Sequence, residues 1–372
     1  MAERSTVRVE VEGLTLASAA GDILVNGVDL AVSSGEIVAL VGESGSGKSL
    51  TALAILGLLP RGITRLGGRV RLNGIDVTDL AGPHAAVRGR QIGAIFQDPQ
   101  ASLDPRWTVG RYLTGQFRRY GATSRRAAET AAADMLARVG LGDPGRVMGA
   151  YPHELSGGMA QRVMIAGALA AGPQFLIADE PTTALDVTTQ AQILDLLEDL
   201  QAETGLGVLL ITHDLGVVAE MAQRVVVLYG GSVMETGEAA DVLGASWHPY
   251  TQALLAAMPD LARSEPPHPI PGSPGDRLAA GTGCPFQPRC RDAIPLCAQR
   301  PPSVVVSGSH RAACHRSEPR MPLGLGTMAT RIASTDASVL LPSPSLPSPS
   351  LSSPSLSLPR AGVSSEERRH VG

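Results

Sequence analysis

The first part of the chain carries the hydrophobic patterns of β-strands. Residues 7–12 (VRVEVE) alternate between apolar and polar side chains, as in a strand with one buried face. Residues 35–42 (GEIVALVG) hold an unbroken apolar run, which predicts a strand buried on both faces. Residues 49–59 (SLTALAILGLL) predict a helix directly after a glycine-rich loop. A strand–loop–helix unit is therefore expected near the start of the chain.

The same patterns continue to about residue 240. Residues 69–80 predict a hairpin that turns at Asn73-Gly74, and residues 108–171, rich in Ala and Arg, are expected to be mostly helical. The later segments should form a buried strand, a helix, a second buried strand and a strand pair with a Gly-Gly turn, at residues 175–180, 188–203, 208–213 and 225–235.

The chain changes character after about residue 259. Prolines cluster there, and all four cysteines lie between residues 284 and 314. From about residue 337 the sequence is a low-complexity run of Pro, Ser and Leu, for which we expect disorder.

Composition narrows the functional classes. The 372 residues carry a net charge of -4 and are 44% hydrophobic, so a nucleic-acid partner is not expected. The first thirty residues contain no apolar segment of a signal peptide. The longest uncharged apolar run, between Arg162 and Asp179, is interrupted by Gly172-Pro173. We therefore expect a cytoplasmic protein that would reach a membrane only by docking onto other subunits.

Residues 42–49 (GESGSGKS) have the pattern of a phosphate-binding loop between a strand and a helix. The glycines allow successive backbone N–H groups to point at phosphate oxygens, and the helix N-terminus adds its dipole. Lys48 is expected to reach the β- and γ-phosphates, and Ser49 to ligate Mg²⁺. The residues expected to bind nucleotide here are Gly42, Ser44, Gly45, Gly47, Lys48 and Ser49. A plain glycine-rich turn is the weaker interpretation.

Polar residues at the ends of other predicted strands complete a hydrolytic site. Asp179 should hold Mg²⁺, and Glu180 should polarise the attacking water. Gln97, after a strand-like run, suits contact with both the metal and the γ-phosphate, and His213 suits a bond to the γ-phosphate. A loop amide and a structural histidine are the alternatives for these two residues.

A second glycine-rich motif, LSGGMAQR at residues 155–162, opens the next predicted helix. Ser156, Gly157 and Gly158 at a helix start form a second anion site. One chain needs only one phosphate-binding loop to bind one ATP, so we expect this second loop to cover the γ-phosphate held by a partner subunit. The alternative is a simple helix N-cap at Ser156.

In their order along the chain, these motifs resemble those of an ABC-transporter ATP-binding subunit over residues 8–240. The resemblance implies an α/β P-loop NTPase fold with a RecA-like core, an antiparallel β subdomain and a helical subdomain at about residues 100–171. It also implies a head-to-tail dimer that sandwiches two ATP molecules, in which Asp186 of the TALD motif contacts the partner. The implied division is a nucleotide-binding domain at 1–245, a Cys-containing C-terminal extension at 246–335 and a disordered tail at 336–372.

A narrower resemblance is to the oligopeptide, dipeptide and nickel importers. It rests on FQDPQASLDP (96–105), WHPYT (247–251), GCPFQPRC (283–290) and Met159 in the second glycine motif. It implies an ATPase that energises uptake of di- or oligopeptides from the cytoplasmic face of the membrane, as a peripheral subunit. The implied partners are a second ATPase, identical or different, membrane permeases and, indirectly, a solute-binding protein. A soluble ABC ATPase without a transport role and a redox-sensing interaction protein are the alternatives.

One feature departs from that family. Its members usually stack adenine on an aromatic residue before the phosphate loop, whereas this chain has no Phe, Tyr or Trp before Phe96. We expect weaker ATP affinity or looser base selectivity.

The four cysteines suggest a metal site. Clustered thiols in a cytoplasmic protein favour metal over disulfides. Four thiolates suit a [4Fe–4S] cluster, and the resemblance favours that interpretation. The absence of a C-x-x-C pair weakens the zinc interpretation, but zinc and structural thiols remain open. The candidate ligands are Cys284, Cys290, Cys297 and Cys314, with His315 as a weaker candidate.

Overall fold

The structure, a computed structural model, describes residues 8–79, 87–183, 185–258, 268–277, 279 and 281–316. Two compact units are distinguished, residues 1–334 and 335–372, and the second lies outside the described residues together with the predicted tail. The finer boundaries at residues 245 and 335 and at 100–171 stay predictions.

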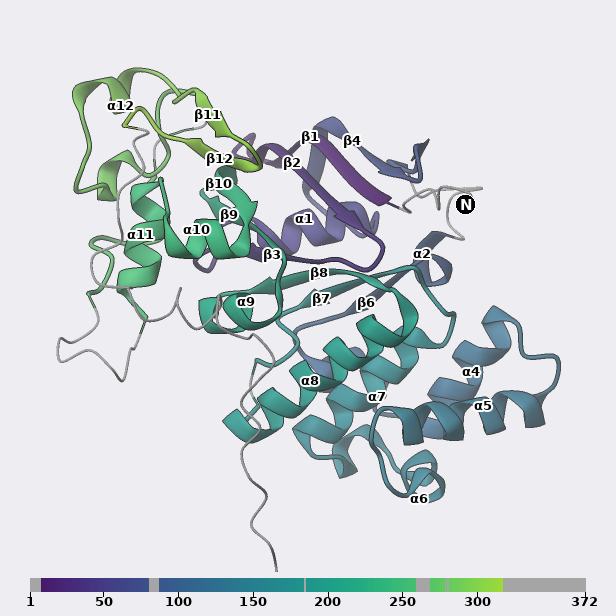
Figure 1. Cartoon of the computed structure of the whole chain (residues 1–372). Coiled ribbons are helices and arrows are strands. Elements are labelled where there is room, and N and C mark those ends of the chain that lie inside the picture. The colour runs from purple at the N-terminus through teal and green to yellow at the C-terminus, as the bar shows by residue number, and fades with distance from the viewer. Residues whose placement is uncertain are drawn as a thin grey trace, which may run out of the picture. The chain divides into compact units, whose positions relative to one another are not determined.

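An eight-stranded sheet forms the centre of the first unit (Figure 1). Five of its strands are parallel, in the order β9-β3-β8-β7-β6. Their bounds are β3 Ile37–Val41, β6 Ile92–Ile95, β7 Phe175–Asp179, β8 Gly207–Thr212 and β9 Arg224–Tyr229. All residues of β3 and β8 are buried, which confirms the prediction from their unbroken apolar runs.

A second, four-stranded sheet is entirely antiparallel, in the order β2-β1-β4-β5. Its strands are β1 Arg8–Ser18, β2 Ile23–Ser33, β4 Ile63–Leu72 and β5 Ile75–Asp76. The predicted hairpin turns at Asn73 and Gly74, whose φ angles of 53° and 76° are those of a tight hairpin turn. Helix α1 (Lys48–Ile55) shares one apolar core with both sheets through Ala52 and Ile55.

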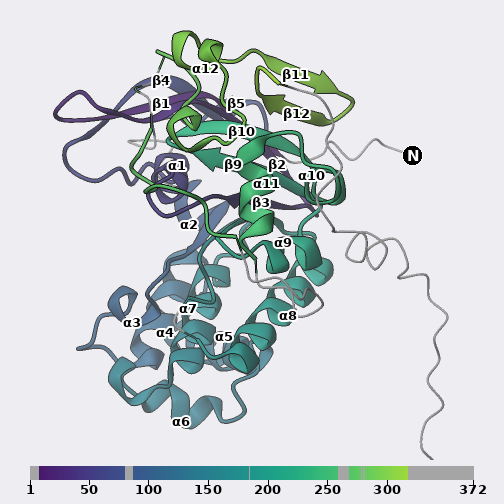
Figure 2. The same cartoon turned by 90° about the vertical axis from the view of Figure 1, so that its left-hand side faces the viewer.

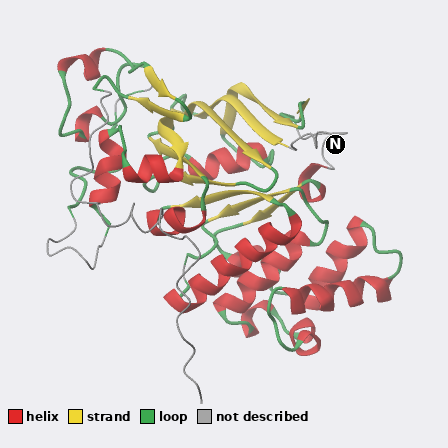
Figure 3. Ribbon diagram, viewed as in Figure 1, coloured by secondary structure: helices red, strands yellow, loops and turns green. Residues whose placement is uncertain are grey.

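Helices cover the opposite face of the central sheet (Figure 3). The predicted helical region contains α3 Pro99–Ser102, α4 Val109–Tyr120, α5 Arg125–Arg138, α6 Pro144–Gly149 and α7 Gly157–Leu169. Helices α4 to α7 share a second core with α8 (Val187–Thr204), which lies beside the sheet, whereas α3 has no buried residue. The remaining short helical elements of this part are α2 Val87–Arg90, η2 Pro152–Glu154 and α9 Leu215–Met221.

The C-terminal extension continues the central sheet (Figure 2). Strands β11 (Val304–Ser307) and β12 (His310–Ala313) form a hairpin, and β12 pairs with β10 (Ser232–Glu238). Helices α10 (Ala239–Gly244), α11 (Pro249–Ala256) and α12 (Pro295–Gln299) and the short η3 (Gln287–Arg289) surround a third core. This core joins β9 and β10 to the cysteine region, so the extension is packed directly on the strands next to the phosphate loop.

No helix among these described residues is long and apolar enough to cross a membrane.

Candidate functional site

The glycine-rich loop lies between β3 and α1, as predicted. Gly47 is the N-cap of α1 with φ of 103°, and no side chain caps the helix, so its first N–H groups stay available. Gly42 has φ of 149°, and a Cβ there would collide with the carbonyl oxygen of Leu228. Glycine is thus required at both positions, by backbone conformation and by close approach.

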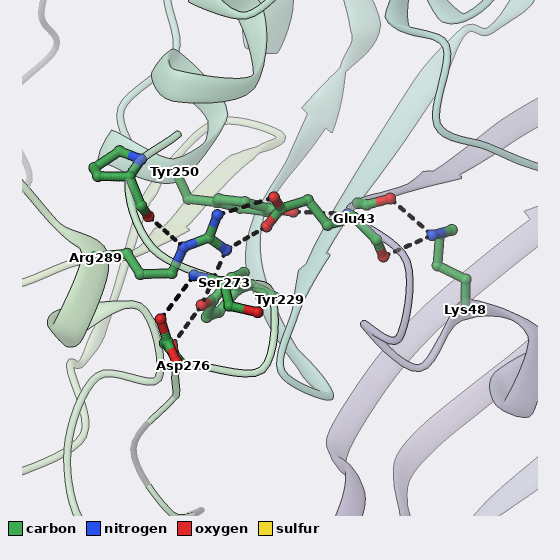
Figure 4. A network of polar contacts seen from close by, with 9 residues as sticks. Glu43, Lys48, Tyr229, Tyr250, Ser273, Asp276 and Arg289 are labelled. Atoms are coloured by element: carbon green, nitrogen blue, oxygen red, sulfur yellow. Dashed lines mark hydrogen bonds and ion pairs between the residues drawn. The ribbon is translucent and has the colours of Figure 1, made fainter. Parts of the chain in front are cut away.

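Lys48 lies inside this loop. Its side chain is bonded to two backbone carbonyls of the loop, with Nζ 2.7 Å from Gly42 O and 3.0 Å from Glu43 O (Figure 4). Burial lowers the pKa of Lys48, while the carboxylates of Glu180, Asp179 and Glu43 oppose that shift. The loop therefore holds a desolvated cation that forms no ion pair with a carboxylate among the described residues, an arrangement suited to an incoming anion.

Ser49 and Asp179 meet next to the lysine. Ser49 Oγ donates a hydrogen bond of 3.2 Å to Asp179 Oδ1, which joins the start of α1 to the end of β7. Burial raises the pKa of Asp179, and the nearby Glu180 carboxylate adds to the shift. A hydroxyl and a carboxylate are the hard oxygen ligands that Mg²⁺ prefers.

The Glu180 carboxylate is contacted by both remaining residues of the predicted hydrolytic site. Gln97 Nε2 lies 2.9 Å from Glu180 Oε2, and His213 Nδ1 lies 3.5 Å from Glu180 Oε1. Thr183, for which the sequence suggested no role, also donates to Oε2 at 2.8 Å. Glu180 has φ of +48°, which is uncommon outside glycine. The structure thus brings three strand ends together around one carboxylate.

The second glycine motif lies elsewhere, against the TALD segment. Ser156 is the N-cap of α7 and accepts from Met159 N at 3.3 Å, so the N-cap alternative describes its role within one chain. A Cβ on Gly158 would lie 2.5 Å from Thr189 Cγ2, and one on Gly157 would lie 3.2 Å from Leu185 Cδ2. These glycines therefore allow the start of α7 to pack against the start of α8.

Asp186 caps α8 in this second group. It accepts from Thr189 N at 3.0 Å and from Thr189 Oγ1 at 2.7 Å, and these bonds lower the pKa of its carboxyl group. Among the described residues, no hydrogen bond or ion pair joins residues 156–158 or Asp186 to the phosphate loop. The predicted site residues therefore form two separate groups within one chain.

The four cysteines lie in the described part of the extension as thiols. Burial raises the pKa of Cys284 to about 12, and the charges of Cys297, Cys290 and Cys314 add to this shift. Burial likewise raises the pKa of Cys290 to about 11. Across the described ranges, however, no group of three or more His, Cys, Asp or Glu side chains could hold a metal ion as arranged. The Nε2 atom of His315 lies 3.0 Å from the backbone carbonyl oxygen of Arg300.

The structure also contains an ion pair that the sequence analysis did not predict. Glu43 of the phosphate loop forms an ion pair with Arg289 of the extension. No motif spacing signals a pair separated by 246 positions.

Comparison with known protein families assigns both parts of the chain. Residues 25–183 match the family described as ABC transporter, and residues 234–297 match the family described as oligopeptide/dipeptide transporter, C-terminal region.

Several relatives cover most of this chain. A protein of Brucella abortus, named as a peptide import ATP-binding protein, is 48% identical over 309 residues, which are 79% of this chain and 91% of the relative. The dipeptide transport ATP-binding protein DppD of Bacillus subtilis is 44% identical over 80% of this chain and 90% of its own. OppD of Mycobacterium tuberculosis, an oligopeptide transport ATP-binding protein, is 46% identical, but the match covers 49% of its length.

Solved structures agree with this assignment. The protein cbiO1 of Clostridium perfringens, part of an ABC transporter complex, superposes with a TM-score of 0.56 at 27% identity, over 63% of this chain and 89% of its own. A dimeric ATP-binding cassette solved in a post-hydrolysis state with ADP and Pi gives 0.55 at 32% identity, over 62% and 98%. Sequence, site geometry and fold agree, and the chain belongs to the family of ATP-hydrolysing, ATP-binding subunits of ABC transporters.

Proposed function

We propose that this chain energises a membrane importer of di- or oligopeptides by ATP-driven closure of a dimer. The observation that carries the ATPase part is the convergence of Gln97, Thr183 and His213 on Glu180, beside Lys48 and the Ser49–Asp179 pair. The peptide-import part is supported by the match of residues 234–297 and by the names of the relatives. Neither a non-transport ATPase nor a redox-sensing protein gains support from these comparisons.

The roles within one subunit follow from the contacts. Lys48, now held by two carbonyls, would exchange them for β- and γ-phosphate oxygens, and the N–H groups from Gly42 to Ser49, including those of Ser44 and Gly45, would surround the phosphates. Ser49, Asp179 and Gln97 would hold Mg²⁺, which neutralises phosphate charge. Glu180 would accept the proton of the attacking water, and His213 would orient the γ-phosphate.

The second group of residues supports a two-subunit site. Ser156, Gly157, Gly158 and Asp186 lie apart from the phosphate loop of their own chain, so we assign them to the ATP bound by a second ATPase subunit, identical or different. Val187, next to Asp186, is 84% exposed, as expected for an apolar residue covered by a partner. Permease subunits would hold this dimer at the cytoplasmic face of the membrane and receive solute from a binding protein.

Replacing Glu180 with Gln tests the catalytic assignment. The amide cannot accept a proton, so we expect ATP turnover to fall by about 100-fold or more, while ATP binding persists. Lys48→Ala should instead lose binding. Steady-state phosphate release and equilibrium binding of a fluorescent ATP analogue distinguish the two effects. Normal hydrolysis by the Glu180→Gln protein would show that the base lies elsewhere.

We also propose a [4Fe–4S] cluster on Cys284, Cys290, Cys297 and Cys314, with zinc as the alternative. The proposal is supported by the four thiols within one short segment, of which Cys284 N donates to Cys297 O at 2.8 Å, but it requires them to move, because their present arrangement could not hold a metal. Protein purified without oxygen should be brown and contain iron and sulfide. Colourless protein with one zinc per chain would favour the alternative.

A further inference from the structure

The second residue of the phosphate loop is held by the C-terminal extension. Glu43 receives two parallel hydrogen bonds from Arg289, Nη1 to Oε2 at 2.5 Å and Nη2 to Oε1 at 3.0 Å (Figure 4). Its backbone N–H also donates to the Tyr250 hydroxyl at 2.8 Å. Both the side chain and the backbone of this loop residue are therefore fixed by residues from beyond position 245.

Arg289 is itself held rigidly by its surroundings. Its side chain is 2% exposed. Nε donates to Pro271 O at 2.7 Å, and Nη1 also lies 3.3 Å from the hydroxyl of Tyr229, whose ring centre is 5.7 Å from the guanidinium. The bonds to Glu43 raise the pKa of Arg289, so the group stays charged at every relevant pH. Such a bidentate, partly buried pair is geometrically specific and less screened by salt than a fully exposed one.

A carboxylate in an anion-binding loop needs a reason. An unpaired Glu43 would repel the triphosphate whose phosphates the same loop receives. Its backbone carbonyl is also one of the two that hold Lys48 Nζ, at 3.0 Å. Neutralising the carboxylate and fixing its backbone therefore both favour phosphate binding.

We propose that Arg289 is a positioning residue of the ATP site: it cancels the charge of Glu43 and, with Tyr250, holds the loop in the conformation that receives the phosphates. This inference rests on the proposed function of the loop. It makes the extension a structural part of the nucleotide site, whatever its role toward metal or transported solute. Because Arg289 directly precedes Cys290, the loop is also connected to the cysteine region.

The direction in which ATP affinity changes in three variants distinguishes this role from a merely structural one. In the full-length chain, Arg289→Gln leaves Glu43 unpaired, so the dissociation constant and KM for ATP should rise about tenfold while kcat changes little. Glu43→Gln leaves the cation, so ATP should bind as tightly as to wild type or more tightly. The double variant removes both charges and should bind within about threefold of wild type. A merely structural pair would make all three variants weaker.

Binding of a fluorescent ATP analogue, steady-state ATPase kinetics and thermal unfolding measure these effects. Arg291→Gln, the same change at an exposed arginine two positions on, is the matched control and should change nothing. If Arg289→Gln does not fold, Arg289→Lys can replace it. Lysine keeps the charge but cannot form the two parallel hydrogen bonds, so its dissociation constant for ATP should lie between those of wild type and an unpaired Glu43. Wild-type affinity in Arg289→Gln, or a double variant as weak as Arg289→Gln, would overturn the inference. Lys48→Ala binding as wild type would instead count against the proposed function.

Discussion

At the scale of single residues, the described turn between β1 and β2 offers no aromatic ring on which the base of a nucleotide could stack. Ala19 and Ala20 are exposed in the turn between β1 and β2, close to Leu24, whose carbonyl oxygen would be 3.1 Å from a Cβ on Gly47. Stacking on an aromatic ring is worth about 1–3 kcal/mol per base, and here it is missing. We therefore expect KM for ATP and KM for GTP to agree within about fivefold, since only phosphate contacts remain.

An aromatic side chain in that turn should make the protein prefer ATP over GTP. Ala20→Tyr should lower KM for ATP by about fivefold or more, whereas Ala20→Leu, which adds apolar surface without a π-system, should not. Steady-state hydrolysis of both nucleotides measures this. A wild-type protein that strictly prefers ATP at low micromolar concentration would show that another residue supplies the platform.

The residues of the hydrolytic site could be predicted because each belongs to a local pattern. Lys48 and Ser49 follow a strand and begin a helix, and Asp179 and Glu180 end an apolar strand, so chain order alone places them at one edge of a parallel sheet. The Glu43–Arg289 pair follows from no such pattern. It exists because the extension packs beside β9, which is a property of the tertiary structure.

At the scale of elements, apolar runs predicted the parallel strands well, but the hairpin of β11 and β12 was missed. The valines of β11 (VVVS) do favour a strand, but the run is only four residues long and three of the four are exposed, so it adds little to the core. Its partner β12 is placed by pairing with β10, where Glu235 lies opposite Ala312. The valines favour an extended backbone, and the sheet that the hairpin joins decides where this short edge strand lies.

The junction of β10, α11 and β12 should make stability depend on pH. Burial lowers the pKa of His248 to about 4, although the nearby Glu235 carboxylate opposes the shift. Between pH 6.5 and 4 the unfolded chain binds a proton at this residue that the folded chain excludes. The free energy of unfolding should therefore decrease as the pH falls through this range, by up to about 3 kcal/mol in total.

Chemical unfolding at pH 7.5 and pH 5.5 measures the effect, for which this residue alone predicts a loss of about 1.4 kcal/mol. His248→Gln should flatten the dependence, because the replacement does not titrate, and the same change at the exposed His153 should leave it as it is. An unchanged pH dependence in His248→Gln would show that other groups cause the effect.

At the scale of the whole molecule, the proposed division of the nucleotide site between two groups of residues on one chain predicts a second subunit. The phosphate loop and the Ser156–Gly158 loop have no bond to each other within the described residues, and the second loop lies against a segment that exposes Val187. Covering this side chain would bury apolar surface beside the loop that we assign to the partner's ATP, so dimer closure and nucleotide binding should depend on each other.

Val187→Asp tests this dependence without disturbing the fold. The side chain is 84% exposed, and an acid at the first turn of α8 suits the helix dipole. In the Glu180→Gln background with ATP, size exclusion with light scattering should show a dimer, alone or with the native partner ATPase, and Val187→Asp should abolish it while the monomer binds ATP within about twofold of the parent. Val304→Asp, at an apolar residue 58% exposed on the extension, is the matched control and should still dimerise. If the Glu180→Gln protein stays monomeric with ATP under both conditions, the two half-sites do not meet across a dimer.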